Sequence, residues 1–322
     1  MPELSQLFFI QSMSRRTLLT LTVLNTLLVL VLFASIIRIK AKPESAQKPT
    51  IQQLSLDNEN LDKLWGLILE TSEFQTKIES LSKIPEDSEQ ASRLKKLQKL
   101  PTPANWDIIQ QTRWKIEIFT KWAKAEGSLQ EVLRAASAIV DNPAENIAYR
   151  EEALKQTVIL LSARLRTTPI PKDVNDDAKT IILWLTTLVR SKQSNSLPGT
   201  ALLGLAILNQ QYPTLSAQIN LTEQVTVATK SPLTLLRQSA LQTIANNQLP
   251  EFKDFVITTI QDPANNTELA LAIFALGEIG SPEDLSTLSY VSPPTSEILW
   301  VVAQARENIG TKYHIQTNAF DD

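Results

Sequence analysis

The longest apolar run of the chain, residues 17–37, lies close to its N-terminus and contains no charged side chain. At about 1.5 Å per residue, a helix over this run spans roughly 31 Å, which matches the hydrocarbon core of a bilayer. Basic residues border both ends, so the pattern predicts a single transmembrane helix. The residues taken to define this anchor are Arg15, Arg16, Leu18, Leu24, Leu28, Phe33 and Arg38.

Two other interpretations of this run are a cleaved signal peptide and a buried core helix. Residues 14–19 resemble a twin-arginine export signal, but no A-x-A cleavage site follows them. Basic residues after the run favour a cytoplasmic C-terminal part, whereas the short basic tail 1–16 is typical of a bacterial signal anchor. We slightly prefer the signal-anchor interpretation. We therefore expect a single-pass protein of the plasma or inner membrane, with its soluble part on the extracytoplasmic side.

The rest of the chain shows helical periodicity and no strand-like alternation, so the predicted class is all-α. Residues 38–56 are polar and contain two prolines, which is typical of a linker. Short links between the predicted helices imply antiparallel neighbours. The helices are expected near 57–82, 86–100, 103–125, 128–141, 143–167, 174–192, 198–211, 214–229, 232–246, 250–262, 267–280, 283–290 and 295–309.

Hydroxyl–proline pairs predict several helix starts, because the hydroxyl can cap the helix and proline suits its first position. These pairs are 102–103, 231–232 and 281–282. Ser281 and Asp284 also approximate a capping box, in which the carboxylate reaches back to a free backbone amide.

A six-residue pattern recurs four times in the C-terminal third. It reads ALLGLA at 201–206, ALQTIA at 240–245, ALGEIG at 275–280 and ARENIG at 305–310. Small and large residues recur at positions that share one helix face, so neighbouring helices can approach closely. Helix pairs repeating every 30 to 39 residues are typical of a stacked solenoid. The predicted stacking residues are Ala201, Leu202, Ala240, Leu241, Ile244, Ala275, Leu276, Ile279, Gly280, Ala305 and Ile309.

The stretch AIFALGEIGSPEDLSTL at 272–288 resembles the short bacterial HEAT repeat of the phycobilisome-lyase type. Such repeats have an Ala/Leu-rich first helix, a Gly-Ser/Asp-Pro turn and a Leu-rich second helix. The resemblance covers residues 197–310. It implies a HEAT-like α-solenoid that binds a protein partner, although a few relatives act on bilin chromophores.

The last copy differs from the others, because Arg306 replaces the large apolar residue. An arginine there suits a terminal repeat that has no further neighbour to cover it. Gly310 is expected to end the helix in a left-handed cap, leaving 311–322 as a polar tail.

The N-terminal soluble part, 57–195, is predicted to be an α-helical region, and degenerate repeats are one interpretation of it. Trp114 and Trp122 lie on one helical face. They are either part of the core or an exposed candidate interface, since tryptophan is enriched at binding hot spots. The basic run 93–99 is either a solvated face or a contact for an acidic partner or anionic lipid.

Composition excludes several kinds of chemistry. The chain has no cysteine and one histidine, His314, which lies in the predicted tail. Its seven glycines form no phosphate-binding loop. The acidic pairs 151–152, 176–177 and 283–284 are adjacent in sequence, so on a helix their members do not face each other. We therefore expect no catalytic residue, no cofactor and no metal site.

The charge of the chain is uneven, with five Lys and Arg against twelve Asp and Glu in 201–322. This acidic half argues against a nucleic-acid partner. The expected function is a membrane-anchored scaffold or adaptor that holds a protein partner along its concave face. The alternatives are an envelope component that self-associates through its transmembrane helix, and a non-catalytic or lyase-like subunit of an enzyme.

Overall fold

The computed structural model describes residues 58–166 and 172–315. All regular secondary structure in these two ranges is helical, which confirms the predicted all-α class. The predicted anchor 17–37, the linker 38–56 and the end of the tail lie outside the described residues. Within the described ranges, no helix is both long and apolar enough to cross a bilayer.

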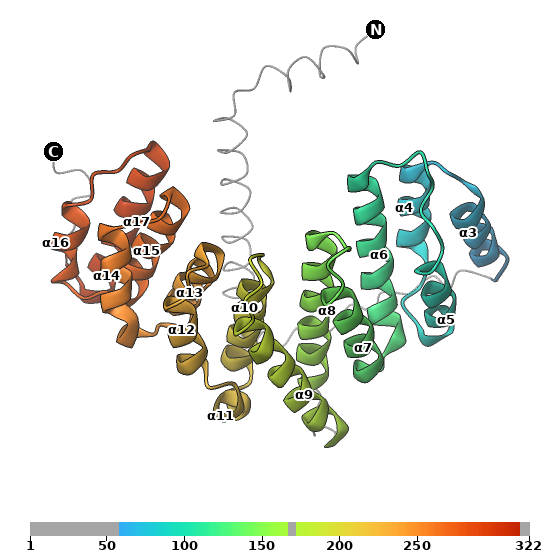
Figure 1. Cartoon of the computed structure of the whole chain (residues 1–322), viewed down its shortest axis with the longest axis horizontal. Helices are drawn as coiled ribbons and strands as arrows, with labels where there is room; N and C mark the ends of the chain where they lie inside the picture. The colour runs from blue at the N-terminus through green and yellow to red at the C-terminus, as the bar shows by residue number, and fades with distance from the viewer. Residues whose placement is uncertain (1–57, 167–171, 316–322) are drawn as a thin grey trace, which may run out of the picture. The chain divides into compact units, whose positions relative to one another are not determined.

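The described residues form a succession of helices joined mostly by short links (Figure 1). They are α3 (Asn58–Glu70), α4 (Phe74–Lys83), α5 (Ser88–Leu97), α6 (Ile108–Glu126), α7 (Leu129–Val140), α8 (Ile147–Leu165), α9 (Lys172–Val189), α10 (Leu197–Gln211), η1 (Pro213–Leu215), α11 (Ser216–Ile219), α12 (Leu221–Thr229), α13 (Thr234–Asn247), η2 (Pro250–Phe252), α14 (Lys253–Gln261), α15 (Asn266–Ile279), α16 (Asp284–Ser289) and α17 (Ser296–Tyr313).

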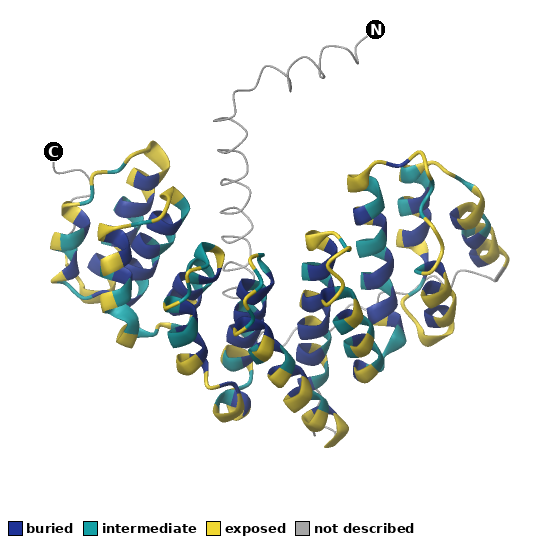
Figure 2. Ribbon diagram, viewed as in Figure 1, coloured by how far each residue is buried: buried dark blue, intermediate teal, exposed yellow. Residues whose placement is uncertain are grey.

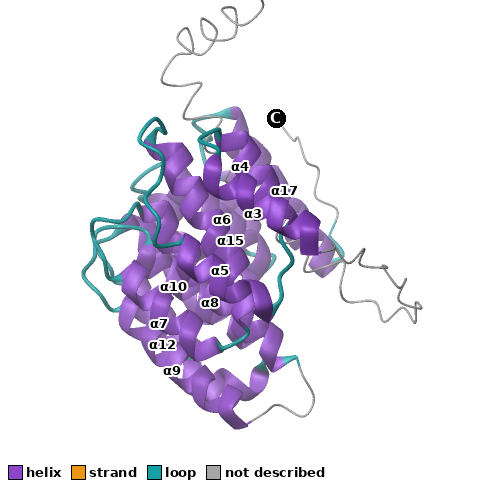
Figure 3. Ribbon diagram, turned by 90° about the vertical axis from the view of Figure 1, so that its right-hand side faces the viewer, coloured by secondary structure: helices purple, strands orange, loops and turns teal. Residues whose placement is uncertain are grey.

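These helices pack as repeated antiparallel pairs in two rows (Figures 1 and 3). The A row contains α4, α6, α8, α10, α13, α15 and α17, and each of these helices packs against the next one in the row. The B row contains α3, α5, α7, α9, α12, α14 and α16, and each packs against the A helix that follows it in sequence. The arrangement is that of a helical repeat, and the term α-solenoid fits it. Both rows continue through the N-terminal half, where the sequence shows only weak repetition.

Polar contacts between successive pairs show the same period. Their partners are 30 to 38 residues apart in sequence, about the length of one repeat. The contacts include Lys115–Glu145, Arg237–Glu268, Arg190–Glu223, Lys95–Glu131 and Lys124–Glu86. They occur from the link between α4 and α5 to α15, so side chains connect neighbouring pairs along most of the described part.

The predicted stacking residues, from Ala201 to Ile309, are all buried, and they lie on the consecutive A helices α10, α13, α15 and α17, except Gly280, which is the C-cap of α15. Two of the helix crossings are close enough to need a small residue. A Cβ atom added to Gly277 would lie 2.8 Å from the Cα atom of Ala305 in α17. One added to Gly199 would lie 2.3 Å from the hydroxyl oxygen of Ser239 in α13. Small residues therefore permit the close approach in this half of the chain.

Several predicted helix boundaries are wrong. The helix predicted over 57–82 is interrupted by residues 71–73, and the one over 214–229 is broken at Asn220, whose φ is 44°. The helix predicted to start at Pro103 starts at Ile108. There Asp107 forms a full capping box with Gln110, which satisfies two free backbone amides where the Thr102 hydroxyl offers only one.

The C-terminal cap is also misplaced in the prediction. Helix α17 continues through Gly310 to Tyr313, and His314 is the left-handed residue, with a φ of 57°. The Ile315 N–H then donates to the Gly310 carbonyl over 2.8 Å, which closes the last turn. The predicted contact between Ser281 and Asp284 is confirmed, because the Asp284 carboxylate accepts the Ser281 N–H at 2.8 Å.

Candidate interaction surfaces

The acidic residues of the described part form no group that could hold a metal ion. No cluster of three His, Asp or Glu side chains with metal-binding geometry occurs in residues 58–166 and 172–315. Glu278 in α15 accepts a hydrogen bond from the Asn308 side chain at 3.0 Å. This contact joins α15 to α17.

The tryptophans proposed as a candidate interface belong to the core. Trp114 is 4% exposed and Trp122 is 1% exposed, so the interface interpretation is wrong for both. Trp114 packs edge-on against Trp106, with ring centroids 5.8 Å apart. The indole N–H of Trp122 donates to Glu126 at 3.2 Å. The eight-residue spacing of these two tryptophans therefore marks a buried face of α6, with Ile118 buried between them.

The basic run 93–99 is largely used within the fold. Arg93 pairs with Asp62 at 3.0 Å, and Lys95 pairs with Glu131 at 3.1 Å. Lys96 and Lys99 are exposed at the C-terminal end of α5 and just beyond it. The run is therefore mainly a solvated face, and its ion pairs with Asp62 and Glu131 connect α5 to α3 and α7 in the B row.

Two inter-repeat ion pairs of the C-terminal half have a buried carboxylate. Arg237 donates from its Nε atom to Glu268 at 2.9 Å, and the Glu268 side chain is 2% exposed. Lys253 pairs with Asp284 at 2.8 Å. Burial raises the pKa of Asp284, but hydrogen bonds from Lys253 and Ser281 outweigh this and lower it overall. The same contact with Asp284 raises the pKa of Lys253. Both pKa shifts favour the charged forms of Lys253 and Asp284 in the folded chain.

Exposed apolar side chains gather where the A helices begin. The A helices run in the same direction, because a B helix returns the chain between them, so their first turns lie along one edge. This edge carries large apolar residues that are between 38% and 74% exposed, and Figure 2 shows exposed residues at the upper ends of α6, α8 and α17. We call it the A-helix edge, and define it by Ile108, Ile109, Ile147, Leu235, Leu299 and Trp300.

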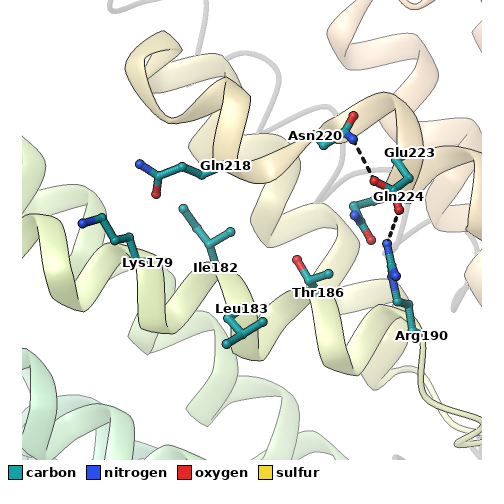
Figure 4. A pocket seen from close by; sticks show the side chains of 9 residues that line it. All are labelled: Lys179, Ile182, Leu183, Thr186, Arg190, Gln218, Asn220, Glu223 and Gln224. Atoms are coloured by element: carbon teal, nitrogen blue, oxygen red, sulfur yellow. Dashed lines mark hydrogen bonds and ion pairs between the residues drawn. The ribbon is translucent and has the colours of Figure 1, made fainter.

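A second surface feature lies in the B row, between α9 and the α11–α12 junction (Figure 4). It is a pocket of about 430 Å³. We call it the α9–α12 groove, and it is lined by Lys179, Ile182, Leu183, Thr186, Arg190, Gln218, Asn220, Glu223 and Gln224. The α9 residues recur every three or four positions, so they share one helix face. Across from them, the left-handed conformation of Asn220 breaks the B-row segment into α11 and α12.

The polar side chains of the groove differ in their partners. Arg190 donates to Glu223, which also accepts from the Asn220 side chain at 2.7 Å. Gln224 is only 2% exposed, yet its carbonyl oxygen is buried without a hydrogen-bond partner. The groove was not predicted, because it arises from the break at Asn220, and a single asparagine at that position is not a distinctive signal.

A scan against protein-family models found no match, and a search of curated proteins found none either. The inference of a function therefore depends on the repeat and on the two surfaces described above.

Proposed function

We propose that this protein is a membrane-tethered, HEAT-like helical-repeat scaffold that holds a protein partner and performs no chemistry itself. The proposed tether is the apolar run 17–37, and the proposed binding surface is the A-helix edge. The linker 38–56 separates the tether from the repeat.

The observation that carries the proposal is the row of exposed apolar residues along the A-helix edge. A single exposed leucine on a soluble surface needs no explanation, but several large apolar residues are exposed near the starts of α6, α8, α13 and α17, at the same end of these helices. Trp300 is 56% exposed and Ile109 is 74% exposed. Large apolar and aromatic side chains are the residues that protein interfaces bury at their centres.

The acidic charge of the C-terminal half favours a protein over a nucleic acid as the partner. Residues 201–322 contain five basic and twelve acidic side chains. Nucleic-acid phosphates require clustered lysine and arginine. Two of the arginines and lysines in this half, Arg237 and Lys253, are already paired with carboxylates.

The test is purification of the tagged full chain from solubilised membranes, with quantification of the proteins that remain bound. Trp300→Asp and Ile109→Asp should each remove a partner that the unsubstituted chain retains in stoichiometric amount. Ile159→Asp is the matched control, because Ile159 is an apolar residue of α8 that is 52% exposed and lies away from the A-helix edge. Loss with the control as well, or self-association as the sole interaction, contradicts the proposal. A retained chromophore would instead favour a lyase-like subunit.

A further inference from the structure

The first two helix pairs expose three large aliphatic side chains close to the linker that precedes them. Leu67 and Leu69, in the last turn of α3, are 48% and 57% exposed, and Leu100, which follows α5, is 50% exposed. The end of a helical repeat normally presents polar residues to water, because it has no neighbour on one side. We call these three leucines the N-terminal patch, and their exposure calls for a surface that covers them.

The patch belongs to the two links that join α3 to α4 and α5 to α6 (Figure 1). Trp106 connects these links, because its indole N–H donates to the Ser72 carbonyl at 2.7 Å and its ring packs edge-on against Phe74, with centroids 5.1 Å apart. The backbone of Leu100 is also fixed, since its N–H donates to the Leu97 carbonyl at 3.1 Å. The fold therefore holds this exposed apolar surface in place.

The position of the patch along the chain favours the bilayer as the surface that covers it. Helix α3 begins at residue 58, and the proposed tether ends at residue 37, so 57 − 38 + 1 = 20 residues separate them. Such a segment reaches at most about 66 Å when extended, and a flexible chain of this length spans about 25 Å on average. The tether therefore keeps the first helices near the membrane, where a high local concentration makes even a weak contact effective.

The side chains of the patch suit a lipid surface better than a protein partner. All three are aliphatic, whereas protein interfaces are centred on aromatic residues and arginine. Lys96 and Lys99 precede Leu100 and are exposed, and neither forms an ion pair with another described residue. At a bilayer, a lysine stem can lie along apolar groups while its ammonium group stays among the headgroups. Glu70 and Glu73 are exposed at the α3–α4 link, so the local charges balance and the contact should not require anionic lipid.

We propose that the N-terminal patch rests on the bilayer that holds the tether, with Leu67, Leu69 and Leu100 at the boundary between headgroups and acyl chains. The proposal depends on the proposed tether at 17–37, because so few apolar side chains bind a membrane only marginally by themselves. It goes beyond the scaffold function by assigning one end of the repeat to the membrane. The A-helix edge near Trp300 stays available to a protein partner.

Site-specific labelling tests this contact in the full chain, because the sequence contains no cysteine. A fluorophore on Leu100→Cys, in vesicles of phosphatidylcholine with brominated acyl chains, should be quenched at least about twofold relative to unbrominated vesicles. The matched control is the same label on Leu183→Cys, because Leu183 is 68% exposed and lies inside α9 of the B row. Bromine should not affect the control. Equal quenching at the two positions contradicts the proposal.

Substitutions within the patch provide a second measurement. Leu67→Asp combined with Leu69→Asp should reduce the lipid quenching of the Leu100→Cys label by about half or more, because a carboxylate resists transfer out of water. Leu183→Asp should leave that quenching unchanged. Both leucines of the patch are exposed, so the double substitution should hardly alter the melting temperature. If it does unfold the chain, the label on the otherwise unsubstituted chain still decides.

The remaining outcomes separate other occupants of the patch from failure of the tether. A label that is shielded from aqueous iodide but not quenched by brominated lipid would show that the linker 38–56 or a second copy of the chain covers the patch, and the proposal would be wrong. A chain that leaves the vesicles at alkaline pH contradicts the tether and the patch together. A chain that stays in the vesicles while its label is open to water contradicts the patch alone, and Trp300→Asp still tests the scaffold function.

Discussion

The same substitution, glycine to alanine, should have opposite effects at two helical positions of this chain. Gly66 lies inside α3, and a Cβ atom added there has no neighbour within 4 Å. Gly277 lies inside α15, where an added Cβ atom would be 2.8 Å from the Cα and 2.9 Å from the Cβ of Ala305. The contrast isolates the effect of the crossing between α15 and α17.

The magnitudes follow from two opposing terms. Alanine is favoured over glycine inside a helix by up to about 1 kcal/mol, and this term applies at both positions. At Gly66 no other term opposes it, so Gly66→Ala should stabilise the chain by about 0.5–1 kcal/mol. At Gly277 the added methyl group meets backbone, which cannot rotate away, and such overpacking typically costs about 1–3 kcal/mol. Gly277→Ala should therefore be about 1–3 kcal/mol less favourable than Gly66→Ala.

Urea unfolding followed by circular dichroism gives the overall effect of each substitution. Hydrogen exchange on α15 and α17 gives the local effect, which matters because repeat proteins can open one pair at a time. Ala305→Gly in the Gly277→Ala background should restore part of the loss, since it removes the opposing methyl group while the α17 backbone still crowds the new side chain. If Gly277→Ala stabilises the chain as much as Gly66→Ala does, α15 and α17 do not cross at this point.

Three further outcomes test other parts of the structure. The pKa of Asp284 is lowered in the folded chain, so the stability that this carboxylate contributes is complete above its ordinary pKa of 3.8 and is lost as the pH falls through the folded pKa. The free energy of unfolding should therefore depend less on pH in the acid range for Asp284→Asn than for the unsubstituted chain. Ending the chain before residue 295 removes α17, uncovers the apolar face of α15 and should cause aggregation, detectable by light scattering; a soluble, monomeric product would show that α17 is not needed as a cover. The full chain should remain with the membrane during alkaline carbonate extraction, and deletion of residues 1–42 should release it; recovery of the intact chain in the soluble fraction contradicts the tether at 17–37.

The sequence was sufficient to predict the helical class and the face of each C-terminal helix that is buried. The recurring pattern at 201–206, 240–245, 275–280 and 305–310 places its small and large residues on one face, and the structure buries them. This prediction works because close helix packing constrains residue size, and residue size is visible in a single sequence.

Features that depend on a specific local conformation were missed. The sequence favoured Gly310 as the left-handed cap, yet His314 has the positive φ and Gly310 lies within the helix. Gly280 is another case: its φ is −68°, so alanine is not excluded by the backbone torsion, but the added Cβ atom would lie 2.4 Å from the Leu276 carbonyl oxygen. The effect of a substitution at such positions depends on neighbouring atoms, which the sequence does not specify.

The side chains at the contacts between neighbouring A helices differ between the two halves of the chain. This difference explains why repetition is visible in only one half of the sequence. In the C-terminal half, Gly277 meets Ala305 and Gly199 meets Ser239, so close approach requires small residues at the crossings. In the N-terminal half, α6 meets α8 through aromatic rings, with the centroids of Phe119 and Tyr149 6.2 Å apart. Large rings fill this contact, and many combinations of apolar residues can fill a similar volume equally well. The packing of A helix on A helix therefore continues through both halves, but it leaves a recognisable sequence pattern only where small residues are required at the crossing.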